Sequence, residues 1–186
     1  MEAGVILFDL IFKPGAALRK ISREKPVSAA MLITFLATFA VVMSVLLTFS
    51  PARQNMLAAV LFGASISLLR LIFLLVLSLF VFLVSRLLLG KGSYMALFSS
   101  LGFIQFILVF LPVIEAIGSM QGGAEFISIW LRNAVYIWLV IMVVLAVKES
   151  LKISTGRAVL SLILTGAGIT FLIVFTILSM TAMISF

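Results

Sequence analysis

Cysteine and histidine are both absent from the 186 residues, and charged residues make up only 10% of the chain. The first absence excludes disulfides, thiolate nucleophiles and imidazole bases, and it removes the usual ligands of zinc sites. An enzyme would have to rely on grouped carboxylates or on a Ser–Lys pair, and the sequence shows no such grouping. We therefore expect a protein that is not an enzyme and that needs no cofactor or metal.

The scarcity of charge also sets the class of protein. A soluble domain usually carries about a quarter charged residues, whereas this chain is 65% hydrophobic and has a mean hydropathy of +1.40. Residues 71–89 contain Arg86 as their only charge. As a helix they would extend about 28 Å, which matches the hydrocarbon core of a bilayer. The sequence predicts an all-α protein, a polytopic helical bundle integral to the membrane.

Five transmembrane helices are predicted in a membrane domain of residues 26–186, and they cover residues 27–49, 70–89, 94–118, 126–147 and 158–184. Residues 56–70 are ambiguous, because joining them to the second span would give a helix of about 50 Å, longer than an ordinary bilayer is thick. We favour a short embedded or interfacial segment with a bend at Gly63. In the third span, Pro112 is expected to cause a kink.

Small residues recur at the spacing that allows close approach of membrane helices. Ala30, Thr34 and Thr38 are four residues apart in the first span, and a second small-residue group occupies positions 166–170 in the fifth. Gln105 and Asn133 are candidates for hydrogen bonds between helices. We expect these positions to lie at helix contacts.

The segment 1–25 is predicted to form an interfacial amphipathic helix. Pro14 suits the first turn of a helix, after which Ala17, Leu18 and Ile21 share one face. The opposite face is basic, so we expect the helix to lie on the membrane, a loose basic tail being the alternative. The candidate contacts to anionic lipid are Lys13, Arg19, Lys20, Arg23 and Lys25.

The basic residues are distributed unequally between the two ends of the predicted spans. The formal net charge is +7, but the charges lie in short connections, where they indicate orientation and anionic lipid and not a nucleic acid partner. Outside the predicted spans, Arg53 is the one basic residue on the side opposite the N-terminus. By the positive-inside rule we expect a multi-pass cell-membrane protein with a cytoplasmic N-terminus and an external C-terminus. The residues on the cytoplasmic side would be Lys13, Arg19, Lys20, Arg23, Lys25, Arg86, Lys91, Lys148, Lys152 and Arg157.

Four charged residues fall in or near the outer half of the predicted bilayer: Arg70, Glu115, Glu125 and Arg132. Charges at such positions cost several kcal/mol on insertion scales and usually find partners. The functional interpretation is a polar site for an ion, a lipid headgroup or a small solute. We favour the structural alternative, in which arginine pairs with glutamate between helices or extends toward the interface. Glu115 and Arg132 end consecutive spans and are expected to pair, with Arg70 nearby.

Short motifs along nearly the whole chain carry a resemblance to a known family. They are Phe12-Lys13-Pro14 with Leu18-Arg19-Lys20-Ile21, Gly90-Lys91-Gly92-Ser93-Tyr94 followed by Leu97-Phe98 and Pro112, and Trp138 with Val147-Lys148-Glu149-Ser150 and Gly156-Arg157-Ala158. Together they resemble the Yip (Ypt-interacting protein) family of five-span membrane proteins. Eukaryotic members bind prenylated Rab GTPases and act in vesicle traffic, whereas this chain looks more like the bare domain found in bacteria and archaea.

The resemblance implies a non-enzymatic membrane protein that organises membranes or acts as a scaffold in membrane traffic. It would bind partners or lipids through its basic cytoplasmic face. Its partners would be the bilayer, anionic lipids at that face, and a second copy or another membrane protein. The alternative is a small transporter or channel that uses the four charged residues, with broken helices at Gly63 and Pro112.

Overall fold

The computed structural model describes residues 3–49, 55–118 and 124–184, and these residues form helices without any strand. The predicted all-α class is therefore confirmed. Four segments are long and apolar enough to cross a membrane: Val27–Leu47, Met56–Leu87, Tyr94–Gly118 and Glu125–Leu151. In chain order the helices are α1 (Ala3–Phe12), α2 (Pro14–Glu24), α3 (Val27–Phe49), α4 (Met56–Leu87), α5 (Tyr94–Ile104), the 3₁₀ helix η2 (Gln105–Val109), α6 (Phe110–Gly118), α7 (Ala124–Leu151) and α8 (Thr155–Ile184).

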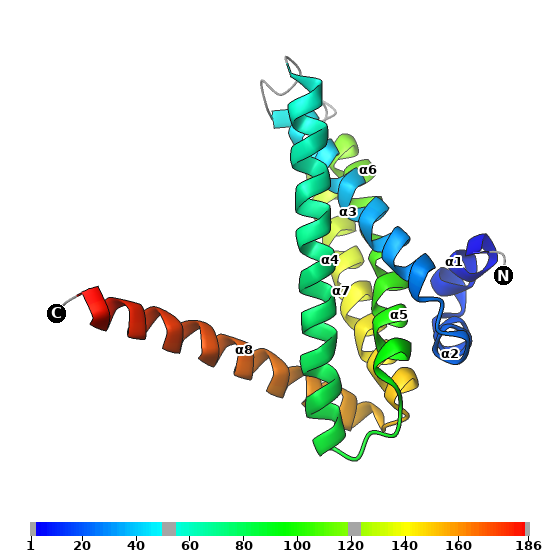
Figure 1. Cartoon of the computed structure of the whole chain (residues 1–186). Coiled ribbons are helices and arrows are strands. Elements are labelled where there is room, and N and C mark those ends of the chain that lie inside the picture. The colour runs from blue at the N-terminus through cyan, green and yellow to red at the C-terminus, as the bar shows by residue number, and fades with distance from the viewer. Residues whose placement is uncertain (1–2, 50–54, 119–123, 185–186) are drawn as a thin grey trace.

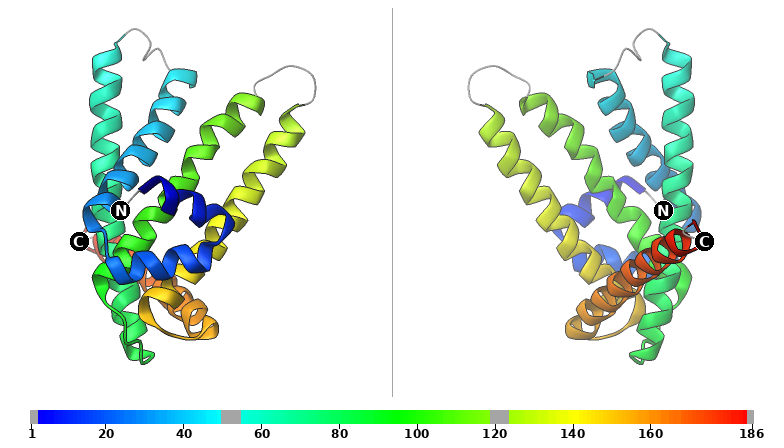
Figure 2. Two further views of the ribbon diagram at one scale, coloured as in Figure 1. Left: turned by 90° about the vertical axis from the view of Figure 1, so that its right-hand side faces the viewer. Right: turned by 90° about the vertical axis from the view of Figure 1, so that its left-hand side faces the viewer.

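Helices α3 to α7 form a bundle that is closed at one end and open at the other. The α3–α4 pair diverges from the α6–α7 pair toward the end at which α4 begins (Figure 2). Helix α5 packs against α2, α3, α4 and α7. Helix α8 starts beside α4 and α7 and then extends away from the other helices (Figure 1). The closed end thus carries the contacts that hold the bundle together.

Helix α4 is continuous from Met56 to Leu87, so the bend that we expected at Gly63 does not occur. Asn55 caps its first turn by accepting a hydrogen bond from the Ala58 amide at 3.1 Å. At Gly63 a Cβ atom would lie 3.2 Å from the Met43 sulfur and from the ring of Phe39, both on α3. The glycine therefore permits close packing of α3 against α4. This contact, and not a bend, is the reason for its presence.

The third predicted span, 94–118, consists of three consecutive helical elements, α5, η2 and α6. Ser93 caps α5 by accepting from the Ala96 amide at 3.3 Å. Pro112 has no amide hydrogen to donate to the carbonyl of Leu108, four residues earlier. The helix tightens to 3₁₀ geometry over Gln105–Val109. The irregularity expected from Pro112 thus lies in the turn that precedes it.

Helix α2 has the expected amphipathic pattern, but its apolar face does not face a bilayer. Ala17, Leu18 and Ile21 are almost fully buried, and α2 packs against α5 and α7. Periodicity shows only that one face is apolar; that face packs on the bundle, whereas the basic face with its predicted lipid contacts is exposed. In α1, by contrast, Phe8 and Phe12 are more than half exposed, which makes α1 the N-terminal helix with bulky apolar side chains on its surface.

Of the two groups of small residues, one lies at a contact between helices and the other does not. On α3, the Thr34 hydroxyl donates to the carbonyl of Gly102 on α5 at 3.4 Å, and a Cβ at Gly102 would come within 2.8 Å of the Ala30 Cβ. The expected close approach is confirmed there. On α8, a Cβ at Gly166 or Gly168 would meet nothing within 4 Å. The expected contact is therefore not found on α8, because no other described residue packs against these two glycines.

The turn between α4 and α5 is bound directly to the end of α7. The amides of Lys91 and Gly92 both donate to the carbonyl of Leu151, at 3.0 and 3.2 Å. A Cβ at Gly92 would overlap the carbonyl oxygen of Ser150 and lie 2.5 Å from the Cα of Leu151. Because the obstructing atoms belong to the backbone, they have no rotamer by which to move away.

We predict that Gly92→Ala destabilises the protein by about 2 kcal/mol or more, since the two backbones must separate and lose their hydrogen bonds. Thermal unfolding of the purified chain in detergent, followed by tryptophan fluorescence, measures the effect. Gly156→Ala is the matched control, because a Cβ at Gly156 meets no atom within 4 Å. Equal unfolding midpoints for the two variants would contradict this account of the turn.

Candidate functional site

Most of the exposed basic side chains lie at the closed end of the bundle, and Arg70 is an exception on α4. The five N-terminal candidates, Lys13, Arg19, Lys20, Arg23 and Lys25, are all exposed. Arg86, at the end of α4, is exposed but donates to the carbonyls of Gly90 and Gly92. Three further exposed basic residues lie in or directly beside the connections between α4 and α5 and between α7 and α8 (Figure 1). They are Lys91, Lys152 and Arg157. We call these eight residues the basic end surface.

Arg19 differs from its basic neighbours because it fastens α2 to α7. Its Nε lies 2.9 Å from Oε2 of Glu149, and its Nη2 lies 3.4 Å from Oε1. The hydrogen bond and the charge of Glu149 raise the pKa of Arg19 further above its ordinary value, so the guanidinium stays charged at any physiological pH. Within the described residues Lys20 and Arg23 form no ion pair. These two therefore remain available to a ligand.

Of the four charged residues predicted within the spans, two are joined. Arg132 Nη1 on α7 lies 3.2 Å from Glu115 Oε1 on α6. The side chains are 41% and 56% exposed on the protein surface. The pair therefore links antiparallel neighbours along an outer face of the bundle and does not lie in a closed core.

The other two charged residues do not join that pair. Arg70 Nη2 donates instead to Oε1 of Gln105 at 3.1 Å, so the expected role of Gln105 in linking helices is confirmed. The carboxylate of Glu125, in the first turn of α7, forms no ion pair with any residue that the structure describes. Direct bonds among the four therefore join Glu115 to Arg132 alone within the described residues, and the cluster as a whole stays a prediction.

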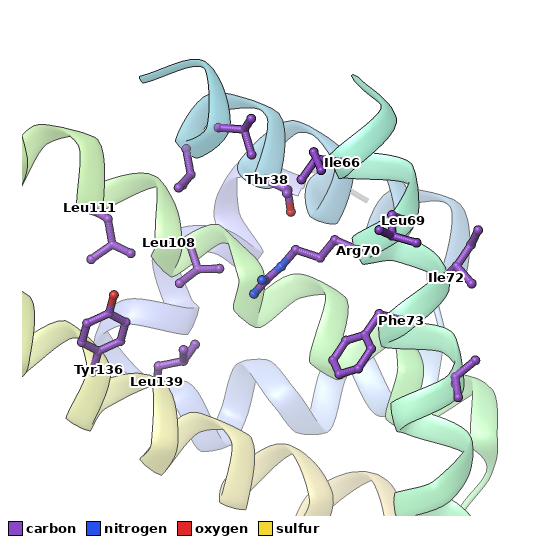
Figure 3. Close-up of a pocket in the computed structure, with 13 residues that line it drawn as sticks. Thr38, Ile66, Leu69, Arg70, Ile72, Phe73, Leu108, Leu111, Tyr136 and Leu139 are labelled. Carbon is purple, nitrogen blue, oxygen red and sulfur yellow. The ribbon is translucent and has the colours of Figure 1, made fainter. Parts of the chain in front are cut away.

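A cavity of about 800 Å³ lies between the two diverging helix pairs, beside Arg70. Its walls come from α3, α4, η2, α6 and α7 and are almost entirely aliphatic or aromatic. Three lining residues carry polar groups: Thr38, Arg70 and Tyr136 (Figure 3). The sequence pattern indicated Arg70 but not Thr38 or Tyr136, because a threonine at small-residue spacing and a tyrosine in an apolar helix have commoner structural roles.

Serine hydroxyls hold the closed end together, and the sequence analysis did not predict them. Ser150 Oγ on α7 donates to Ser100 Oγ on α5 at 2.8 Å. Between α4 and α8, the hydroxyls of Ser85 and Ser161 lie 2.6 Å apart. A serine in an apolar run can equally bond to its own helix, as Ser67 does with the Gly63 carbonyl. Sequence alone therefore gives no sign of which serines cross between helices.

No three acidic side chains among residues 3–49, 55–118 and 124–184 are placed to hold a metal ion. Comparison with families of known proteins gave one match, to the Yip1 domain over residues 8–178. Comparison with curated proteins and with solved structures gave no match. The matched range includes the basic end surface, the Arg132–Glu115 pair and the cavity.

We predict a small, measurable coupling between Glu115 and Arg132. Because both side chains are partly exposed, the pair should contribute about 0.5–1 kcal/mol. Unfolding in detergent of Glu115→Gln, Arg132→Gln and the double variant gives this coupling directly. Glu125→Gln is the control, since its carboxylate has no ion pair in the described part of the chain and its effect should add to that of Arg132→Gln. If the effects of Glu115→Gln and Arg132→Gln also simply add, the Glu115–Arg132 pair contributes nothing to stability.

Proposed function

The chain belongs to the Yip1 domain family, and from this premise we propose that it is a non-enzymatic membrane organiser that binds anionic lipids and partner proteins through its basic end surface. The family match and the apolar helices establish a multi-pass membrane protein. The observation that carries the proposal further is the gathering of eight exposed basic residues at one end of the bundle.

The structure of the N-terminal segment supports this role. Burial of one face of α2 against α5 and α7 fixes the helix, and the Arg19–Glu149 pair adds a second attachment. Lys20 and Arg23 are therefore presented from a fixed helix and not from a loose tail. Preorganised charges lose less conformational entropy when they bind. A surface of this kind suits the headgroups of anionic lipids or an acidic protein partner.

We propose that the basic end faces the cytoplasm and that α8 crosses the bilayer as a fifth span. The positive-inside rule supports the orientation. Helix α8 has 30 residues and is about 45 Å long, which is sufficient to cross even at a strong tilt. With five spans, the two termini would lie on opposite sides of the membrane.

The orientation can be tested directly because the chain has no cysteine. We expect Met56→Cys to react with a membrane-impermeant maleimide in intact cells and Gly156→Cys to react only after permeabilisation. A C-terminal alkaline phosphatase fusion should be active, because the end of α8 would be external. Labelling of Gly156→Cys in intact cells would refute the orientation, and an inactive fusion beside correct labelling would refute the fifth span alone.

We predict that Lys20→Gln combined with Arg23→Gln lowers the preference of the reconstituted protein for phosphatidylglycerol over phosphatidylcholine several-fold at low salt. Each basic residue near an anionic surface is worth about 1 kcal/mol, and salt screens the effect. Association of spin-labelled lipids measures the preference. The charge-conserving double variant Lys20→Arg, Arg23→Lys is the control and should retain it. Equal loss in both variants would show that charge is not the cause.

The alternative function is a small transporter or channel. It would need the charged residues of the spans to share one pathway, whereas Arg70 bonds to Gln105 and Arg132 to Glu115. Solute and ion flux into proteoliposomes distinguishes the two functions. Flux that Arg132→Gln or Glu115→Gln abolishes would favour the transporter.

A further inference from the structure

The polar groups of the cavity lie at similar heights in the bundle, far from the basic end. Measured along the helices, Arg70 is about 24 Å from Arg86 on α4, Thr38 is about 16 Å from the first residue of α3, just after Lys25, and Tyr136 is about 18 Å from Lys148 on α7. Basic residues mark one boundary of the hydrocarbon core, which is about 30 Å thick. The polar groups therefore lie past mid-depth, among the acyl chains of the leaflet remote from the basic end surface.

Arg70 lacks an anionic partner in the part of the chain that the structure describes. Within the described residues its side chain donates one hydrogen bond, to the neutral amide oxygen of Gln105. Gln105 is itself buried, and its Nε2 donates to the Leu101 carbonyl at 3.5 Å, which directs its oxygen toward Arg70. A guanidinium has five N–H donors, and a charge at this depth usually finds a counter-charge. The remaining donors are free to bind an anion.

A second polar group is directed into the same space. Thr38 is only 5% exposed, and its hydroxyl has no hydrogen-bond partner among the described residues. Figure 3 shows its oxygen and the Arg70 guanidinium pointing into the cavity between α3, α4 and η2. Buried hydroxyls are nearly always satisfied. A ligand atom bound by Arg70 would satisfy the hydroxyl as well once the Thr38 side chain turned toward it.

The walls of the cavity fit an acyl chain. A volume of about 800 Å³ falls in the range of ligand-binding pockets. On α4 the lining residues Ile72, Phe73 and Val76 are exposed, so the cavity opens sideways, where a surrounding bilayer places its acyl chains. A ligand can therefore enter from the membrane without passing through water.

From these observations we propose that the cavity binds one anionic phospholipid. Its phosphate accepts hydrogen bonds from Arg70 and Thr38, and one acyl chain lies along Phe73 and Val76. Guanidinium binds phosphate oxygens in a planar, two-point geometry, which favours phosphate over a zwitterionic headgroup with its own cation. This site is separate from the basic end surface and lies at the other side of the bilayer. Either site can fail in experiment while the other stands.

The test is native mass spectrometry of the purified full-length chain with added phosphatidylglycerol, phosphatidylcholine or oleate. We expect the wild type to bind one phosphatidylglycerol in preference to phosphatidylcholine. Arg70→Gln should weaken phosphatidylglycerol binding about tenfold or more and remove the preference, because a hydrogen bond to a charged group is lost. Thr38→Val, which keeps the shape of the side chain, should weaken it several-fold. Val76→Trp should weaken binding of both phospholipids by filling the cavity.

Two variants serve as matched controls and should keep the affinity of the wild type. Arg132→Gln removes an arginine at a similar distance from the basic end, but one that is paired with Glu115 and does not line the cavity. Val140→Trp adds the same bulk as Val76→Trp at an exposed position of α7 outside the cavity. Thermal unfolding without lipid checks that each variant is folded, and Arg70→Lys replaces Arg70→Gln if the latter is not.

Four results would overturn the proposal. Phosphatidylglycerol affinity within twofold of the wild type in Arg70→Gln, or in Arg70→Lys where that variant is used, would exclude the arginine. Equal binding of phosphatidylcholine would exclude recognition of the negative charge. Tighter binding of oleate would assign the site to a free fatty acid. A wild-type dimer that Val76→Trp converts to a monomer would make the cavity a contact between two copies.

Discussion

The bundle depends on close packing and hydrogen bonds at one end. In a bilayer, helices gain little hydrophobic free energy from association, so small residues and hydroxyl groups must hold them together. Here these contacts concentrate near Gly92, whose backbone packs on that of Leu151, and at the Ser150–Ser100 hydrogen bond. The Arg19–Glu149 pair attaches α2 at the same end. The closed end therefore holds several of the closest contacts among the described helices, and it also carries most of the exposed basic residues.

The open end follows from the same distribution of contacts. The α3–α4 pair has its own close contact at Gly63, and the α6–α7 pair has the Glu115–Arg132 ion pair. Each pair is thus internally linked, while bulky apolar side chains separate the two pairs. The separation leaves the cavity that Arg70 and Thr38 line (Figure 3). A lipid-facing cavity and a firmly held basic end are consequences of one asymmetry in where the small residues lie.

Sequence reasoning succeeded where a residue has only one plausible role in a membrane. An apolar run from 27 to 49 has to be a helix, and Glu115 and Arg132 at the ends of consecutive helices have to meet. It failed where one residue type has two roles. Gly63 could permit a bend or a close contact, and the apolar face of α2 could meet lipid or protein. The small residues near Gly166 needed a partner helix that the sequence cannot name. Each failure was decided by a tertiary contact.

The two arginines on α4 and α7 show why the partner matters more than the depth. Arg70 and Arg132 lie at a similar distance of about 24 Å along their helices from the basic end, so burial in the bilayer penalises their charges similarly. Arg132 is neutralised by Glu115, whereas the contact of Arg70 is a neutral amide. A hydrogen bond to an amide satisfies one donor but leaves the charge uncompensated. The phospholipid proposed for the cavity would supply this compensation from the surrounding membrane, without a further protein element.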